Sequence, residues 1–159
     1  MSSCFLIGHR KVPGDILPDL TEAVERHITE FGATEFVIGS CGSFDHMAQQ
    51  VIAEAKERHP EISLSLLLPC CPVEQPPKVP AGFHSLYYPP GTEQVPRRFA
   101  NIRANRYMAA RADYLIAYAW HPASNAWSLV EFARGLGVPV TNLGNGRIQH
   151  TAQKNAPAE

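Results

Sequence analysis

The chain has 159 residues, a length at which roughly two-thirds of the unfolded surface is buried on folding, so one domain with a sizeable core is expected. Its 14 basic and 15 acidic residues give a net charge of -1, without the positive field typical of proteins that bind duplex nucleic acid or anionic membranes. The expected partner is therefore a small molecule, with no duplex nucleic acid and no membrane. The chain has no apolar run long enough to span a bilayer and no basic, signal-like start, so we expect a cytoplasmic protein.

The four cysteines, Cys4, Cys41, Cys70 and Cys71, have no paired CxxC spacing, and the reducing cytosol disfavours disulfides. We expect free thiols. Adjacent cysteines make a poor chelate even with His84 as a third ligand, so no metal site is expected. The chain also lacks the glycine fingerprint of dinucleotide-binding proteins and the lysine of the P-loop, and we expect no resident cofactor.

Apolar periodicity divides the chain into alternating strands and helices. A short strand runs from Cys4 to Ile7, and helical spacing follows from Leu20 to Phe31, with Gly32 as its stop. The later expected elements are a strand at 36–38, a helix at 44–55, a strand at 62–68, a helix at 97–111, a strand at 113–120, a helix at 126–136 and a strand at 138–143.

Two segments fall outside this alternation. The segment from Pro69 to Pro96 is rich in proline, with one extended piece around 83–88, and a connection of this length is typical of a lid, a binding loop, an interface arm or a flexible surface loop. Past Gly144 the residues are small and polar. We therefore predict a folded domain over 1–144 and a flexible C-terminal tail over 145–159.

Strands that alternate with helices are typical of a parallel sheet with helices on both faces. The predicted fold is a Rossmann-like three-layer α/β/α sandwich with a mostly parallel five-stranded sheet. In such sheets ligands bind beyond the carboxyl ends of the strands, at the point where the strand order reverses. The loops after the first, second and fourth strands are therefore candidate binding loops.

These three loops carry groups that suit an anion, because a glycine turn into a helix start leaves backbone N–H groups and a positive dipole end facing one spot. Such turns also occur where nothing binds, so the turn alone leaves both interpretations open. Asp45 either stabilises its helix start or contacts ribose hydroxyls. The predicted ligand-binding residues of these loops are Gly8, His9, Arg10, Gly39, Ser40, Gly42, Ser43, Phe44, Asp45, His121, Ser124 and Asn125.

Two arginines of the expected helix at 97–111 are further candidates. Arg106 shares a helical face with Phe99, Ile102 and Ala109, so we expect it to point inward, where a guanidinium needs an anion or a carboxylate. Arg103 lies one turn earlier and is the second candidate.

Motifs from one end of the chain to the other resemble those of a known family. They are Gly8-His9-Arg10, the Gly39 turn with Phe44-Asp45, Leu68-Pro69-Cys70, Asn105-Arg106-Tyr107-Met108 and Gly137-Val138-Pro139-Val140. Over about residues 4 to 143 the chain resembles the SLOG superfamily, and within it the YpsA-like branch. The resemblance implies a Rossmann-like domain that binds nucleotides or nucleotide-derived ligands, in a family where homodimers are common.

Related LOG-like phosphoribohydrolases cleave the N-glycosidic bond of nucleoside 5′-monophosphates with an arginine before the fourth strand and a glutamate after it. The resemblance implies Arg106 or Arg103 for the first role and Glu131 for the second, with Asp45 as a further catalytic carboxylate beside an oxocarbenium-like transition state. Glu131 shares a side of its helix with Arg134, which is typical of a solvated glutamate.

The loop after the fourth strand departs from the enzyme pattern. Ser124 and Asn125 replace the glycine pair of that family, and Trp127 adds bulk there. We therefore predict a nucleotide-binding protein of the sensor or signalling type. The alternatives are a nucleoside monophosphate N-glycosidase, which is a hydrolase, and an interaction module that uses the segment 69–96.

Overall fold

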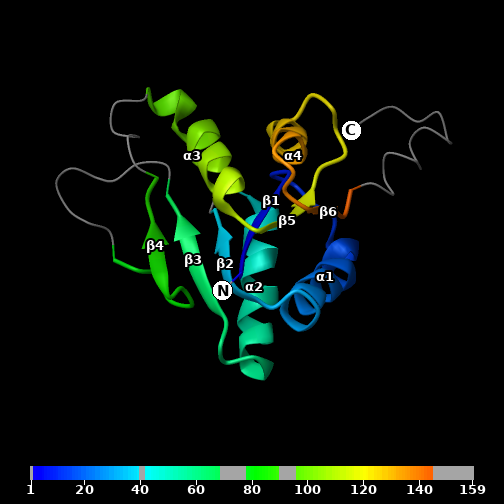
Figure 1. Cartoon of the computed structure of the whole chain (residues 1–159), viewed down its shortest axis with the longest axis vertical. Coiled ribbons are helices and arrows are strands. Elements are labelled where there is room, and N and C mark those ends of the chain that lie inside the picture. Colours follow the sequence, from blue (N-terminus) through cyan, green and yellow to red (C-terminus); the bar gives the residue numbers. More distant parts are fainter. Residues whose placement is uncertain (1, 40–41, 69–77, 90–95, 145–159) are drawn as a thin grey trace, which may run out of the picture.

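The computed structural model describes residues 2–39, 42–68, 78–89 and 96–144, in which strands and helices alternate (Figure 1). In chain order the elements are β1 (Ser2–Gly8), the 3-10 helix η1 (Gly14–Ile16), α1 (Leu17–Thr29), β2 (Ala33–Ile38), α2 (Ser43–Arg58), β3 (Ser63–Leu67), β4 (Ser85–Tyr87), α3 (Arg97–Arg111), β5 (Tyr114–Tyr118), α4 (Asn125–Gly135) and β6 (Val140–Asn142). The predicted Rossmann-like α/β architecture is confirmed.

All strand pairs are parallel, and the strand order is β4-β3-β2-β1-β5-β6. The sheet has six strands instead of the five predicted. The additional strand is β4, which lies within the extended piece expected at 83–88 and pairs Ser85 with Ser65 and Tyr87 with Leu67. The chain builds outward from β1 to β4, then returns to the other side of β1 for β5, so the strand order reverses between β1 and β5.

Helices α1 and α2 cover one face of the sheet, and α3 and α4 cover the other (Figure 1). Alternate residues of the central strands divide between the two cores. Leu6 and Phe36 pack toward α1 and α2, whereas Phe5 and Val37 pack toward α3 and α4. This alternation follows from the period of two in a strand.

Glycines end two of the segments at positions where the backbone is left-handed. Gly32 has a φ of 71° after α1, and Gly137 has a φ of 83° after α4. Both conformations are unfavourable for residues that carry a Cβ. The predicted stop at Gly32 therefore follows α1 in the structure, and Gly137 follows α4 in the same way.

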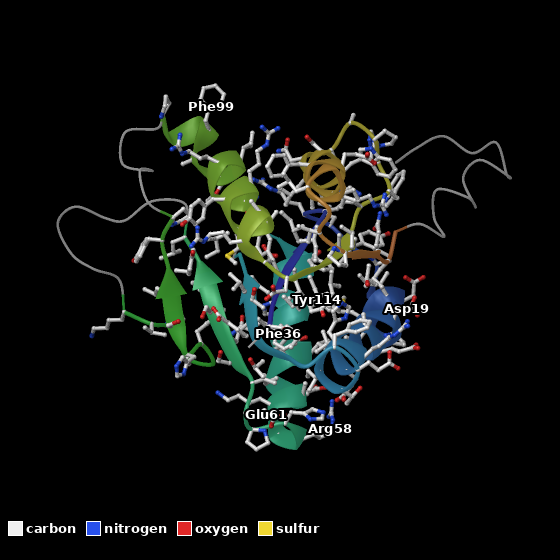
Figure 2. All side chains as sticks on the ribbon, in the orientation of Figure 1. Asp19, Phe36, Arg58, Glu61, Phe99 and Tyr114 are labelled. Carbon is white, nitrogen blue, oxygen red and sulfur yellow. The ribbon has the colours of Figure 1, made fainter. Side chains whose placement is uncertain are left out.

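The inward face of α3 differs from the predicted one. We expected Arg106 to lie on a buried face with Phe99, Ile102 and Ala109, but Phe99 is 48% exposed and Ile102 is 38% exposed. Figure 2 shows Phe99 pointing away from the sheet. The residues of α3 that face the sheet are Ala104, Met108 and Ala109, followed by Ala112 just after the helix. The prediction was wrong because it placed the largest apolar side chains inside, whereas a row of alanines packs there.

Several expectations fall on residues outside those described. They concern Ser40, Cys41, Cys70, Cys71, most of the segment 69–96 and the tail 145–159. Among the described residues, no helix combines the length and the apolar character needed to cross a bilayer.

Candidate functional site

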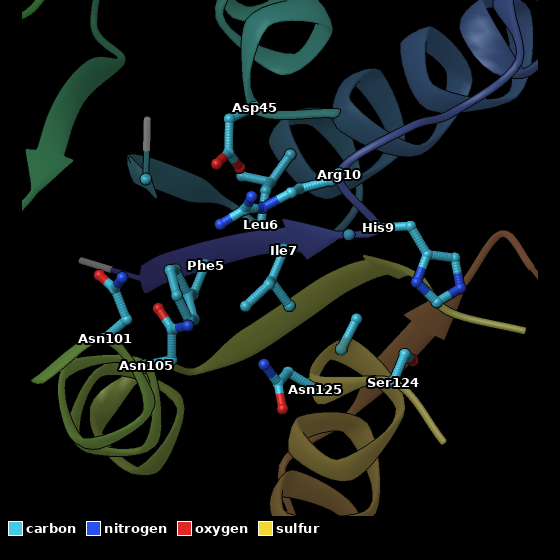
Figure 3. Close-up of a pocket in the computed structure, with 13 residues that line it drawn as sticks. Phe5, Leu6, Ile7, His9, Arg10, Asp45, Asn101, Asn105, Ser124 and Asn125 are labelled. Carbon is cyan, nitrogen blue, oxygen red and sulfur yellow. The ribbon is translucent and has the colours of Figure 1, made fainter. Parts of the chain in front are cut away.

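A hollow of about 270 Å³ lies where the strand order reverses, at the carboxyl end of β1 (Figure 3). The loops after β1, β2 and β5 border it together with one face of α3. Its described lining comprises Phe5, Leu6, Ile7, Gly8, His9, Arg10, Gly39, Asp45, Asn101, Asn105, Ser124, Asn125 and Ala126. We call this hollow the strand-end crevice.

The crevice combines an apolar floor with polar walls. Phe5 and Ile7 of β1 form the floor, and the amide side chains of Asn101, Asn105 and Asn125 line the side toward α3 and α4 (Figure 3). A carboxamide both donates and accepts hydrogen bonds. The walls therefore suit a ligand with mixed donors and acceptors, such as a nucleobase or a sugar.

The loop that carries Arg10 is tied to the start of α2. The backbone N–H of Ser43 donates to the Arg10 carbonyl at 2.7 Å, and the Ser43 hydroxyl donates to the same oxygen at 2.9 Å. The hydroxyl also accepts from the backbone N–H of Val12 at 2.9 Å. A Cβ at Gly42 would lie 2.6 Å from Arg10 Cα, so glycine is needed for this close approach. Gly42 and Ser43, both predicted ligand residues, thus position the backbone of Arg10.

Asp45 and Gly39 meet at the end of β2. A Cβ at Gly39 would lie 3.3 Å from Asp45 Oδ2, which places the carboxylate over the glycine. The predicted site residue Phe44 is buried instead, and its ring lies 2.5 Å from where a Cβ of Gly8 would be. Asp45 therefore reaches the crevice, whereas Phe44 packs beneath Gly8.

His9 joins the end of β1 to the end of β5. Its Nε2 accepts from the backbone N–H groups of Trp120 at 3.0 Å and of His121 at 3.4 Å. Burial lowers the pKa of His9, and the neighbouring His121 lowers it further. A ring nitrogen that accepts is unprotonated, so both observations indicate a neutral imidazole with its proton on Nδ1. Figure 3 shows this ring apart from Arg10 and Asp45.

Ser124 caps α4, because its hydroxyl accepts from the Trp127 N–H at 3.1 Å and donates to the His121 carbonyl at 2.7 Å. His121 Nδ1 accepts from the Ala123 N–H at 3.1 Å. His121 is absent from the crevice lining, whereas Ser124 and Asn125 belong to it. The positive end of the α4 dipole therefore faces the crevice.

Three other predicted residues lie outside the crevice. Arg103 and Arg106 line a separate hollow of about 500 Å³ on the outer side of α3, where the Arg106 guanidinium lies 5.3 Å from the centre of the Phe132 ring. Glu131 is exposed, and its carboxylate lies 3.9 Å from Arg134 Nη1. The three residues assigned to catalysis, Asp45, Arg106 and Glu131, are thus not brought together.

Asn101 and Asn105 line the crevice but were not among the predicted site residues. Their spacing of four residues puts both on one side of α3. The sequence signal that could have indicated them is their position on α3 next to the alanines that face the sheet. Among the described residues, no group of three His, Cys, Asp or Glu side chains could hold a metal ion.

Comparison with known proteins supports the fold. No family model matches the chain, and no curated protein matches its sequence. Its structure is similar to that of DNA processing protein A from Helicobacter pylori, which is described by its single-stranded DNA binding mode, with a TM-score of 0.61 and 18% identity. The match covers 98% of this chain and 74% of the other. At this identity the likeness supports the Rossmann-like fold alone, and membership of the SLOG superfamily and of its YpsA-like branch stays a prediction.

This similarity corrects the expected partners. We expected a small nucleotide or phosphate-containing ligand and no duplex nucleic acid, but a protein of this fold is described as binding single-stranded DNA. The restriction to small molecules was therefore wrong. Its physical basis was the net charge of -1, yet single strands bind largely by base stacking and local cationic groups, which need no overall positive charge.

Proposed function

We propose that the strand-end crevice binds one nucleotide unit, comprising phosphate, sugar and base, either as a free nucleotide or as one residue of single-stranded DNA. The observation that carries the proposal is the convergence of Arg10, Asp45 and the Asn125 end of α4 on one hollow. These groups come from three loops at the reversal of strand order, which is where α/β sheets bind ligands.

Each part of the crevice matches one part of a nucleotide. The Arg10 guanidinium and the start of α4 suit the phosphate, since both present positive charge and N–H donors. The Asp45 carboxylate suits a sugar hydroxyl or a base amine. The amides of Asn101 and Asn105 suit the edge of a base.

The size of the crevice limits its occupant. Its volume of about 270 Å³ lies just below the ~300–1,000 Å³ typical of small-molecule pockets. One nucleotide unit fits this space better than a dinucleotide cofactor does. The apolar floor of Phe5 and Ile7 adds a contact for the sugar or for the face of the base.

Binding without turnover is favoured over N-glycosidase activity. Glycosidic cleavage needs a carboxylate beside the reacting carbon and usually a second acidic group. Asp45 is the one carboxylate among the described lining residues, and Glu131 lies outside, beside Arg134. A sensor or signalling role follows if binding is communicated to another protein.

Calorimetric titration with deoxyribonucleoside 5′-monophosphates, ribonucleoside 5′-monophosphates and 5′-phosphorylated oligothymidylates tests the proposal. It also separates binding of a free nucleotide from binding of single-stranded DNA. Arg10→Ala is expected to weaken every ligand that binds by about ten- to a hundredfold, because a hydrogen bond to a charged group contributes about 1.5–3 kcal/mol. Lys11→Ala is the matched control, since it removes the same charge one residue away.

Two results would contradict nucleotide binding in the crevice: no affinity for any of these ligands, or equal losses in Arg10→Ala and Lys11→Ala. Chromatography of the same mixtures for released base separates binding from hydrolysis. Unchanged ligand after prolonged incubation is the expected result.

A further inference from the structure

We infer that the groove between α3 and α4 holds a second nucleotide next to the one in the crevice, so that the preferred ligand is a single-stranded segment of at least two nucleotides. This inference rests on the proposed function of the crevice. It differs from that function in using residues that the crevice does not contain.

The groove consists of a small hollow between α3 and α4 and the outer hollow beside it, and it adjoins the crevice. A small hollow of about 80 Å³ between α3 and α4 shares Asn105 and Asn125 with the crevice. On its other side it shares Ile102 and Arg106 with the outer hollow of about 500 Å³. The three hollows therefore lie next to one another along α3, so a ligand longer than one nucleotide could extend from the crevice toward the outer hollow.

Helix α3 presents successive pairs of residues along this path. Asn101 and Asn105 face the crevice, Ile102 and Arg106 line the outer hollow, and Phe99 and Arg103 line that same hollow further from the crevice. Each pair is spaced by four residues and so lies on one stripe of the helix. The stripes change from neutral amides to apolar and cationic groups with distance from the crevice.

Apolar side chains dominate the outer hollow although it is open to solvent. Phe99 is 48% exposed and Ile102 is 38% exposed, and Tyr107 and Phe132 also line it. Contiguous exposed apolar groups on a soluble protein are typical of a binding surface. Aromatic rings at such a surface offer stacking faces for bases.

The charge of this surface favours a nucleic acid over an apolar peptide. Among the described residues, no carboxylate lies within ion-pair distance of Arg103 or Arg106, whereas Arg134 on the neighbouring helix lies 3.9 Å from Glu131. The Arg106 guanidinium stacks 5.3 Å over the Phe132 ring, which holds it at the groove. Arginine beside aromatic rings is the usual combination at single-strand binding sites.

A length series tests the inference. Calorimetric titration with 5′-phosphorylated thymidylates of one, two and four nucleotides is expected to give about tenfold tighter binding for two nucleotides than for one, from one added stacking and phosphate contact. The double variant Arg103→Gln with Arg106→Gln is expected to lose this gain while it keeps the affinity for the mononucleotide. Phe132→Leu is expected to lose part of the gain, because it keeps apolar volume but removes the ring.

The control is the double variant Arg26→Gln with Arg134→Gln, which removes the same charge from exposed positions outside the groove. It is expected to retain the gain. Thermal unfolding of every variant checks that the fold is intact.

The outcomes separate the two proposals. Equal affinity for one and two nucleotides, or equal losses in the two double variants, overturns the groove and leaves the crevice standing; the apolar surface is then a candidate for a peptide partner. Absence of mononucleotide binding, together with oligonucleotide binding that depends on Arg103 and Arg106 but not on Arg10, supports the groove and overturns the function proposed for the crevice.

Discussion

The two faces of the sheet are packed differently. On the side of α1 and α2, large side chains fill the core, among them Phe36, Phe44 and Trp120. On the side of α3 and α4, seven of the buried residues are alanines, namely Ala104, Ala109, Ala112, Ala117, Ala119, Ala126 and Ala133. The large apolar residues Phe99 and Ile102 of this second side lie at the surface instead.

This difference separates a stabilising face from a binding face. Side chains that bury the most apolar area contribute the most to stability, and they are concentrated on the α1 and α2 side. The α3 and α4 side uses many alanines inside, whereas Phe99 is 48% exposed at the outer hollow. Exposure of a large apolar surface to water is unfavourable, and on soluble proteins such a surface usually marks a binding site.

The same substitution made on both faces measures the largest effect. Phe36 is 0% exposed, so Phe36→Ala is expected to lower the free energy of unfolding by about 3–5 kcal/mol through lost burial and a cavity. Phe99→Ala, at the outer hollow where the ring is 48% exposed, is expected to cost about 1 kcal/mol or less. Urea unfolding of both variants checks this, and equal losses would mean that the two faces do not differ as described.

A smaller effect is expected from adding volume on the alanine side. Ala109 is 0% exposed, and Ala109→Leu is expected to cost about 1–3 kcal/mol because the tight contact with the sheet has no room for three more carbons. Ala110→Leu, the next residue but exposed, is expected to stay within about 0.5 kcal/mol of the parent. If urea unfolding gave both variants the same stability, close packing of α3 on the sheet would be refuted.

The smallest effect is a dependence of stability on pH. Burial lowers the pKa of both His27, on the α1 side, and His9, at the crevice, so the unfolded chain binds more protons than the folded one. Above pH 6.5, the ordinary histidine pKa, the two histidines do not lower the free energy of unfolding. Below that pH they lower it progressively, because the unfolded chain takes up protons first. Urea unfolding at pH 7.5, 6.5 and 5.5 measures the slope.

His9→Gln and His27→Gln are each expected to flatten this slope, and His46→Gln, at an exposed position, is the control. A slope that His46→Gln changes as much as the two buried substitutions do would contradict the assignment.

The sequence was sufficient for the architecture because strand and helix periods alternate clearly along it. It was insufficient for β4, whose three residues Ser85–Tyr87 are too few to show a period and follow a proline-rich stretch. It also misassigned the inner face of α3, because hydrophobicity ranks Phe99 above Ala104 although the smaller side chain permits closer packing. Propensity therefore predicted the element and missed its orientation.

Sequence reasoning identified the three loops of the crevice but could not divide their residues between ligand contact and internal support. The bond from Ser43 to the Arg10 carbonyl spans 33 positions, and the bond from Trp120 to His9 spans 111. Such pairs leave no local pattern in a single chain. Asn101 and Asn105 were missed for a related reason, because amides spaced along a helix resemble an ordinary solvated surface.

The central position of β1 affects how the protein is made. Its second neighbour is β5, and the bond from Ser3 to Asp113 joins residues 110 positions apart. During synthesis from the N-terminus, one edge of this apolar strand has no strand beside it until β5 has left the ribosome. Fragments that stop short of β5 should therefore aggregate through β1, and delayed translation of the second half should increase the demand for chaperones.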